Sequence, residues 1–265
     1  MNEWIQKSID LAAAENYLDE LANVYPPDPN PPRSIDPAIM TNLRNMFDGG
    51  QDVPLLQELV RLTKNNLLFP VKDVYLGSLK EGGNDMMVNN PQTVTRIVNM
   101  IRSMDGGFDG MVESITSPIE VNRTIGPMFT TYINEKYTVI PAEEFRNSTN
   151  GIRVLAGGDA ALKLFAKDEL DYHLDKGLDI VAKVNEKYVI GEGKFLTDNG
   201  GHQNSQFRDA MHLIDNYNSS KAIVIAILDG VVWIPSGKFI HRTVCTKEKP
   251  CLSALLLDEF FDSLR

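Results

Sequence analysis

The hydrophobic and polar positions along the chain divide it into two regions with different patterns. In the first region apolar side chains recur at helical spacing, most clearly in Trp4–Val24, Ile39–Phe47, Val53–Thr63 and Val94–Met104. These patterns predict a mainly helical N-terminal region, residues 1–120, which we expect to serve in dimerisation or in gripping a ligand.

A proline-rich segment, Tyr25–Arg33, interrupts the helical region and contains five prolines. Proline lacks the backbone donor and its ring clashes with the preceding helical turn. The segment therefore predicts the end of the first helix and a stiff connector after it.

From about Val121 the pattern changes to alternating helix and strand signals, which are typical of an α/β core. Ala222–Leu228 is a continuous apolar run, as expected of a strand that is buried on both faces. The predicted elements of the region 121–265 are a helix at Pro127–Asn134, strands at Leu178–Val184 and Tyr188–Phe195, a helix at Asn204–Tyr217, strands at Ala222–Leu228 and Val231–Ile234, and a closing helix at Ser253–Leu264.

Three ionisable residues are expected to converge on the first two of these strands. If Asn185-Glu186 is the centre of an antiparallel hairpin, Asp179 lies directly opposite Glu192. Cross-strand partners have Cβ atoms about 4.5–5.5 Å apart and share a face of the sheet. Lys194 follows Glu192 by two residues, so its side chain points to that same face.

These residue types suit a metal-dependent hydrolytic site. Mg²⁺ prefers oxygen ligands from one or two carboxylates together with water and phosphate, and Asp179, Glu192 and a main-chain carbonyl near Gly193 could supply them. The amine of Lys194 could orient or help to deprotonate a water and offset charge on phosphoryl oxygens. Glu192-Gly-Lys194 is the only acid-x-Lys triplet in the chain. The alternative is an exposed hairpin that carries a structural ion pair.

The segment after the second strand, Gly200–Gln206, offers groups that could contact DNA. Amide side chains can read adenine edges bidentately, and glycines allow close approach of the backbone to a phosphate. The candidate contacts are Gly201, His202, Gln203, Asn204 and Gln206. The alternative is a polar turn in which Asn204 or Ser205 caps the following helix and His202 is structural.

Composition places the chain among globular proteins, with 43% hydrophobic and 23% charged residues. A net charge of −10 is unusual for a protein that binds nucleic acid, but residues 1–120 contribute −8 of it and residues 121–265 only −2. No export signal or membrane span is predicted. Two cysteines, Cys245 and Cys251, are too few for a disulfide framework and lack zinc-site spacing, so we expect a reduced, cytoplasmic setting.

The pattern of Asp179, Glu192-x-Lys194, a helix from near Asn204 and the buried strand 222–228 resembles the PD-(D/E)XK nuclease superfamily. Within this superfamily the chain resembles type II restriction endonucleases in three short segments, Lys176-Gly-Leu-Asp179, Gly191-Glu-Gly-Lys-Phe-Leu196 and Gly200-Gly-His-Gln-Asn204. This chain departs from the motif in having Leu178 where the name-giving proline stands.

The resemblance implies an α/β fold with a mixed central sheet flanked by helices, the restriction-endonuclease-like core, at 121–265. It implies that Asp179 and Glu192 hold Mg²⁺ and that Lys194 assists the water that attacks double-stranded DNA. It also implies a homodimer and a companion DNA methyltransferase that shares the recognition site. Many members add an upstream acid, for which Glu169 is the candidate and Asp159, Asp168 and Asp175 compete. The alternatives are a repair or recombination nuclease on the same core and a catalytically silent DNA-binding protein.

Overall fold

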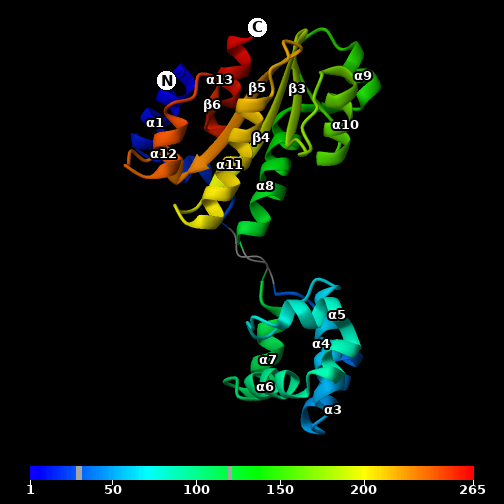
Figure 1. Cartoon of the computed structure of the whole chain (residues 1–265). Helices are drawn as coiled ribbons and strands as arrows, with labels where there is room; N and C mark the ends of the chain where they lie inside the picture. Colours follow the sequence, from blue (N-terminus) through cyan, green and yellow to red (C-terminus); the bar gives the residue numbers. More distant parts are fainter. Residues whose placement is uncertain (28–31, 119–120) are drawn as a thin grey trace. The chain divides into compact units, whose positions relative to one another are not determined.

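The computed structural model of the chain describes residues 1–27, 32–118 and 121–265 and divides it into two compact units (Figure 1). One unit combines Met1–Pro27 with Val121–Arg265, and the other is Asp28–Glu120. The expected boundary at residue 120 coincides with the end of the second unit, but the first 27 residues, which were expected to belong to the N-terminal region, fold with the C-terminal unit. The predicted proline-rich connector lies partly outside the described residues, at positions 28–31.

Apolar contacts explain why the N-terminal segment belongs to the larger unit. Trp4 and Ile5 of α1 (Glu3–Ala13) are buried in the core that also contains the strands, and the Trp4 ring packs edge-to-face on Phe260 at 5.2 Å. The single helix predicted at Trp4–Val24 is wrong. The chain breaks at Asn16, where φ is 66°, and α2 (Tyr17–Leu21) follows.

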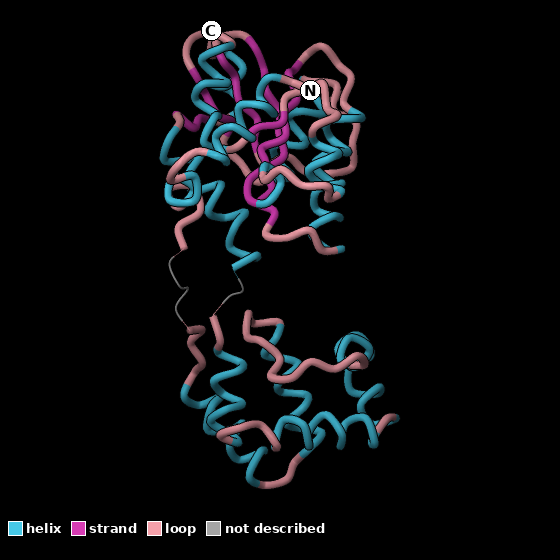
Figure 2. The backbone as a smooth tube through the Cα atoms, turned by 90° about the vertical axis from the view of Figure 1, so that its left-hand side faces the viewer, coloured by secondary structure: helices cyan, strands magenta, loops and turns pink. Residues whose placement is uncertain are grey.

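A six-stranded mixed sheet forms the centre of the larger unit, and helices surround its strands in Figure 2. The neighbours β2–β3 and β3–β4 are antiparallel, and the other three pairs are parallel. The predicted α/β architecture with a mixed sheet flanked by helices is thereby confirmed. In spatial order the strands are β1 (Thr138–Ile140), β2 (Ile152–Leu155), β3 (Ile180–Val184), β4 (Lys187–Leu196), β5 (Ala222–Gly230) and β6 (Cys251–Leu252).

Helix α11 (Gly201–Asn216) packs on β4 and β5 with the face that contains Phe207, Met211 and Ile214, as the apolar spacing predicts. Helix α8 (Val121–Lys136) buries Phe129 and contacts β4 as well. The remaining helices of this unit are α9 (Ala142–Asn147), α10 (Asp159–Glu169), α12 (Phe239–Val244) and α13 (Leu257–Ser263).

Two predicted elements near the C-terminus need correction. The expected strand at Val231–Ile234 is a short 3-10 helix, Val231–Trp233, because the chain turns at Gly230, where φ is 86°. The expected closing helix at Ser253–Leu264 is divided into a 3-10 turn at Ala254–Leu256 and α13. Val232 and Trp233 of the first segment and Phe260 and Phe261 of the second are buried in the core, whereas Ile234 is exposed.

The regular elements in the described part of the smaller unit, residues 32–118, are all helices, and the unit has a hydrophobic core of its own, which includes Leu56, Ile97 and Met111. The backbone N–H of Arg33 donates to Thr116 O at 2.8 Å, and its guanidinium donates to Ser117 O at 3.0 Å. The first and last described segments of this unit are thus tied together. Its helices are α3 (Pro37–Asp48), α4 (Asp52–Thr63), α5 (Leu76–Asn89), α6 (Pro91–Arg102) and α7 (Gly107–Thr116).

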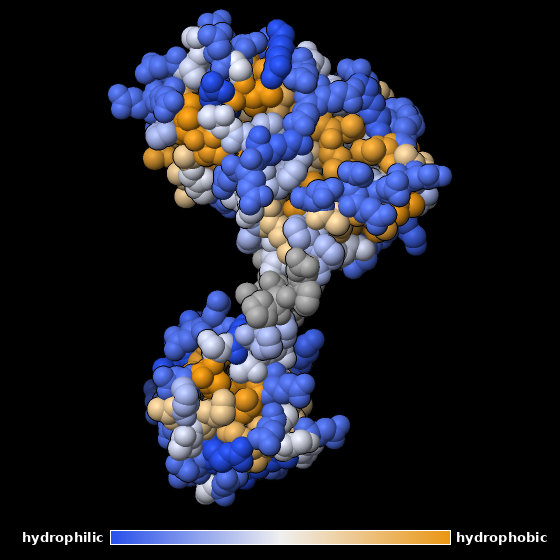
Figure 3. Space-filling model, turned by 180° about the vertical axis from the view of Figure 1, so that it is seen from behind, coloured by the Kyte–Doolittle hydropathy of each residue, from blue (hydrophilic) through white to orange (hydrophobic). Residues whose placement is uncertain are grey.

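Both units present a largely hydrophilic surface in the view of Figure 3, with apolar side chains showing between the polar ones. None of the helices in the described parts of the chain combines the length and apolar character needed to cross a bilayer.

Candidate active site

The β3–β4 hairpin places Asp179 and Glu192 on opposite strands in the predicted register. Ile180 pairs with Gly191, and the backbone N–H of Asp179 donates to the carbonyl of Gly191 at 3.1 Å. The turn is possible because Asn185 adopts a left-handed conformation with φ of 52°, which asparagine tolerates better than most residues. The register fixes both carboxylates at the open end of the hairpin.

Three oxygen-bearing groups converge there on the ammonium group of Lys194. Its Nζ lies 2.6 Å from Oε1 of Glu192, 3.4 Å from Oδ2 of Asp179 and 2.9 Å from the carbonyl oxygen of Gly193. The backbone N–H of Gly193 also donates to Oδ2 of Asp179 at 2.7 Å, which orients that carboxylate. The structure therefore brings together every residue predicted for the catalytic and metal-binding positions.

Burial and charge act on this cluster in opposite directions. Glu192 is 2% exposed, and burial together with the charge of Asp179 raises its pKa, while Lys194 and Lys176 oppose the rise. Burial by itself would lower the pKa of Lys194, but the two carboxylates outweigh this effect and the pKa is raised. Two carboxylates and two lysines thus hold each other in a partly desolvated cluster.

Lys176 is a member of this cluster to which the sequence analysis gave no role. Its Nζ lies 2.7 Å from Oε1 of Glu192 and 3.3 Å from Oδ2 of Asp209 on α11. The hydroxyl of the buried Tyr172 donates to the main-chain carbonyl of Lys176 at 3.1 Å and supports the loop. The position of Lys176, three residues before Asp179, was the feature of the sequence that could have indicated its place in the cluster. Lys176 lies in a loop, however, and the alternation of side chains along a strand does not predict the direction of a loop side chain.

A small cleft of about 150 Å³ opens beside the cluster. Its lining includes Asp179, Lys194, Tyr25 from the N-terminal segment, Phe129 from α8 and Gln206 from α11. The cleft therefore lies where the open end of the β3–β4 hairpin, two helices and the N-terminal segment meet.

The glycine between Glu192 and Lys194 lies close to α8. A Cβ atom added at Gly193 would lie 3.2 Å from ring carbons of Phe129, which is tighter than most real contacts. Even a single Cβ atom at 193 would therefore require the Phe129 ring, which forms part of the cleft wall, to shift by a few tenths of an ångström.

Most of the segment Gly200–Gln206 is helical, because α11 begins three residues before the predicted helix start at Asn204. Helix α11 begins at Gly201 with Gly200 as its N-cap, so neither Asn204 nor Ser205 caps it. Gln203 is only 3% exposed and donates through Nε2 to Oγ1 of Thr197 at 3.0 Å, which turns its amide away from the surface.

The other candidate DNA contacts lie on the first turns of α11. Gly201 and His202 are exposed, and Asn204 is half-buried and donates weakly to Asn199 O at 3.4 Å. The side-chain amide of Gln206 lies 3.1 Å from Nε2 of His202, and Gln206 lines the cleft beside Asp179. Of the five candidates, Gln206 is the one that lines the cleft of the carboxylate pair.

The additional upstream acid was not found in the cluster. Glu169 forms an ion pair with Arg146 at 2.7 Å on α9, and its side chain is exposed. Within residues 1–27, 32–118 and 121–265, no group of three or more acidic, histidine or cysteine side chains is arranged to hold a metal ion. The competing acids Asp159, Asp168 and Asp175 therefore do not complete the pair either.

A family model described as Tsp45I type II restriction enzyme matches residues 2–264. The chain belongs to this restriction enzyme family. The match spans both structural units and carries with it sequence-specific endonuclease activity on DNA. Membership of the Tsp45I family confirms the predicted restriction endonuclease and decides against the repair nuclease and the silent DNA-binding protein. No curated protein and no solved structure shows a significant match to the chain.

Proposed function

We propose that this site-specific deoxyribonuclease has a PD-(D/E)XK core and cleaves double-stranded DNA with Asp179, Glu192 and Lys194, using Mg²⁺. The observation that carries the proposal is the convergence of two carboxylates and the Gly193 carbonyl on one cation, the ammonium of Lys194, at 2.6–3.4 Å. Type II restriction enzymes generally use divalent metal ions, and these oxygens are the natural ligands for one.

The donor set fits Mg²⁺ chemically. Two carboxylates and one carbonyl provide hard oxygen ligands and leave room for water and a phosphate oxygen, as this ion prefers. The ammonium of Lys194 stands among these oxygens, which shows that the position accepts positive charge. A bound divalent ion would lower the pKa of water and polarise the scissile phosphate. Asp179, Glu192 and the Gly193 carbonyl would hold it.

Lys194 contributes a positive charge beside the reacting phosphate. Its side chain is only 21% exposed and its ammonium lies between the two carboxylates, so it would have to move aside when the metal ion binds these oxygens, and it would then offset the negative charge that grows on the phosphoryl oxygens. The amine also has protons with which to orient the attacking water. Attack by the water oxygen forms a new bond to phosphorus and breaks the bond from phosphorus to one sugar oxygen, which leaves as a hydroxyl after taking up a proton, so no covalent enzyme intermediate is needed.

The N-terminal turns of α11 are proposed to contact the DNA near the cut. Gln206 lines the cleft with Asp179, and the exposed Gly201 and His202 precede it on the same helix. Asn204 lies between them, whereas Gln203 supports the helix from inside. Backbone N–H groups at the start of a helix suit the negative charge of a phosphate.

The enzyme is further proposed to act as a homodimer in the cytoplasm. Cleavage of both strands of a palindromic sequence requires two equivalent active sites related by a two-fold axis. A companion methyltransferase that shares the recognition sequence would protect host DNA. The helical unit of residues 28–120 would then help to hold the DNA. This unit takes the place of the predicted region 1–120 in that role.

Chelation and metal titration test this proposal. Excess chelator should abolish cleavage of a sequenced plasmid and Mg²⁺ should restore it. Binding itself can be read independently of activity, because Mg²⁺ should raise the melting temperature of the wild-type protein. Asp179→Asn should lose that shift, whereas Asp175→Asn, a nearby exposed control, should keep it. Full cleavage in excess chelator, or an unaltered melting shift in Asp179→Asn, would remove the metal from this site.

A further inference from the structure

Helix α6 in the smaller unit has its two faces sharply separated. Val94, Ile97, Val98 and Ile101 are buried at 0–2% exposure in the core of that unit. These residues recur at the spacing of one helical face, so the packing of the unit fixes which side of α6 points to solvent. The orientation of the opposite face therefore does not depend on any partner.

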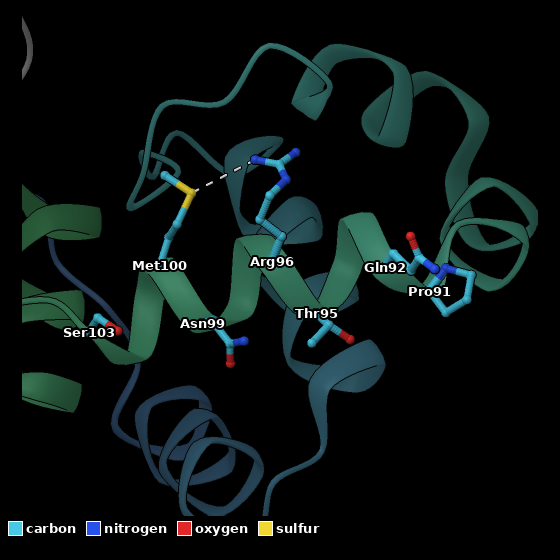
Figure 4. Close-up of a pocket in the computed structure, with 7 residues that line it drawn as sticks. All are labelled: Pro91, Gln92, Thr95, Arg96, Asn99, Met100 and Ser103. Atoms are coloured by element: carbon cyan, nitrogen blue, oxygen red, sulfur yellow. Dashed lines mark hydrogen bonds between the residues drawn. The ribbon is translucent and has the colours of Figure 1, made fainter.

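The exposed face of α6 consists mainly of side chains that can form hydrogen bonds with base edges. Gln92, Thr95, Arg96, Asn99 and Ser103 are all exposed and lie along one open stretch of the surface. Figure 4 shows these side chains along the helix, with Arg96 near Met100 on one edge and Thr95 and Asn99 on the other. We call these five polar residues the α6 polar face.

The charge of α6 sets it apart from its neighbours. Residues 28–120 hold 8 Lys and Arg against 12 Asp and Glu, so this part of the chain is acidic. Among the unit's helices in the described residues, α6 is nevertheless the one that contains no Asp or Glu; its charged residues are Arg96 and Arg102. Phosphate groups on either side of a DNA groove would therefore meet no acidic side chain from the helix itself.

Arg96 is held in place by a carboxylate behind it. Its two terminal nitrogens donate to the two carboxylate oxygens of Asp73, whose side chain is 4% exposed, while the Arg96 side chain is 45% exposed. The Tyr75 ring lies 5.7 Å from the guanidinium carbon. Arginine has five N–H donors, so donors remain after both bonds to Asp73. This support orients the remaining donors toward solvent at little entropic cost.

We propose that the α6 polar face lies in the major groove of the DNA substrate and reads part of the recognition sequence. Amides such as Gln92 and Asn99 match the donor and acceptor pattern of adenine, and Arg96 matches guanine. The stretch from Gln92 to Ser103 is roughly 16 Å long at the usual helical rise. It can follow about four or five base pairs. The inference rests on the family's site-specific cleavage, not on the proposed catalytic roles.

The experiment uses the full-length protein and compares single substitutions on this face. The cleavage sequence is first mapped by digesting a sequenced plasmid with wild-type enzyme, and a duplex with that sequence is then synthesised. Gln92→Ala and Asn99→Ala should each weaken binding to this duplex about tenfold to a hundredfold, since a bidentate base contact is worth roughly 1–3 kcal/mol. Binding to an unrelated duplex should change less than twofold. Asn42→Ala, an exposed amide on α3, serves as the matched control.

The cleavage pattern supplies a second readout. Each variant is given a pool of duplexes in which one base pair of the cleavage site is varied at a time. The α6 variants should no longer discriminate between base pairs at one or two positions of the site. Unchanged discrimination and binding in both variants, with melting temperatures at the wild-type value, would overturn the inference. A change in oligomer size by light scattering without a change in discrimination would assign the face to protein contact and also overturn it. Failure of the catalytic proposal would appear separately, as metal-independent cleavage.

Discussion

The ammonium group of Lys176 lies 2.7 Å from Oε1 of Glu192, the same oxygen that lies 2.6 Å from Lys194. Two lysines thus share one buried carboxylate oxygen. In the proposed mechanism a divalent ion takes its place beside this oxygen and meets both positive charges. In that mechanism Lys194 also assists cleavage, whereas Lys176 approaches from the loop before β3 and has no assigned role.

Removing the charge of Lys176 should therefore strengthen metal binding. In Lys176→Met the Mg²⁺ concentration for half-maximal single-turnover cleavage should fall several-fold, because one repelling charge within a few ångströms of the ion is lost. Lys167→Met, an exposed lysine on α10, should leave it unchanged. A higher Mg²⁺ requirement in Lys176→Met would mean that Lys176 orients Glu192 for the metal and does not compete with it.

Lys194→Ala should separate cleavage from DNA binding. The substitution removes charge stabilisation that matters most in the transition state, so single-turnover cleavage should slow by at least about a hundredfold. Affinity for the cleaved sequence, measured with Ca²⁺, should stay near the wild-type value. Lys187→Ala, at the far end of the same strand, is the matched control. Cleavage within a few-fold of wild type would place the active site elsewhere.

Local sequence patterns predicted the β3–β4 hairpin. The elements that they did not predict depend on packing between residues far apart in the chain. The register of Asp179 opposite Glu192 follows from a short turn at Asn185-Glu186, so sequence alone was enough. Helix α5 went unpredicted because Gly82 and Gly83 resemble a turn, and Gly83 does break it with φ of 59°.

The position of the N-terminal segment depends on contacts that no local pattern reveals. Trp4 packs on Phe260, and the hydroxyl of Tyr25 donates to Asp229 at 3.0 Å, more than 200 residues along the chain. The glycines at 200 and 201 similarly favoured a loop where α11 in fact begins.

Asp229 should make stability depend on pH. It is fully buried, and burial raises its pKa to about 7 although bonds from Ser253, Ala254 and Tyr25 oppose the rise. The folded protein thus keeps a proton that the unfolded chain releases near its ordinary pKa of 3.8. This contribution to stability is present at low pH and is lost as pH rises from about 4 to about 7.

Asp229→Asn, which stays neutral, should remove this dependence. The stability difference, wild type minus variant, should be more favourable to wild type at pH 5 than at pH 8 by an amount on the order of 2 kcal/mol. Urea unfolding at the two pH values measures it. Equal differences at both values would show that Asp229 is ionised in the folded protein even at pH 5.

Gln203 and Gln206 form a matched pair that tests how α11 serves the enzyme. Gln203 is buried with its amide on Thr197, so Gln203→Ala should lower the free energy of unfolding by about 1 kcal/mol and leave DNA discrimination intact. The sequence had predicted a DNA contact at this position.

Gln206 lines the cleft, so Gln206→Ala should weaken binding to the cleaved sequence by roughly 1–3 kcal/mol without changing the melting temperature. Binding titrations and thermal melts on both variants decide the question. If Gln203→Ala weakens specific binding and Gln206→Ala does not, α11 must rotate or unwind at its first turn when DNA is bound.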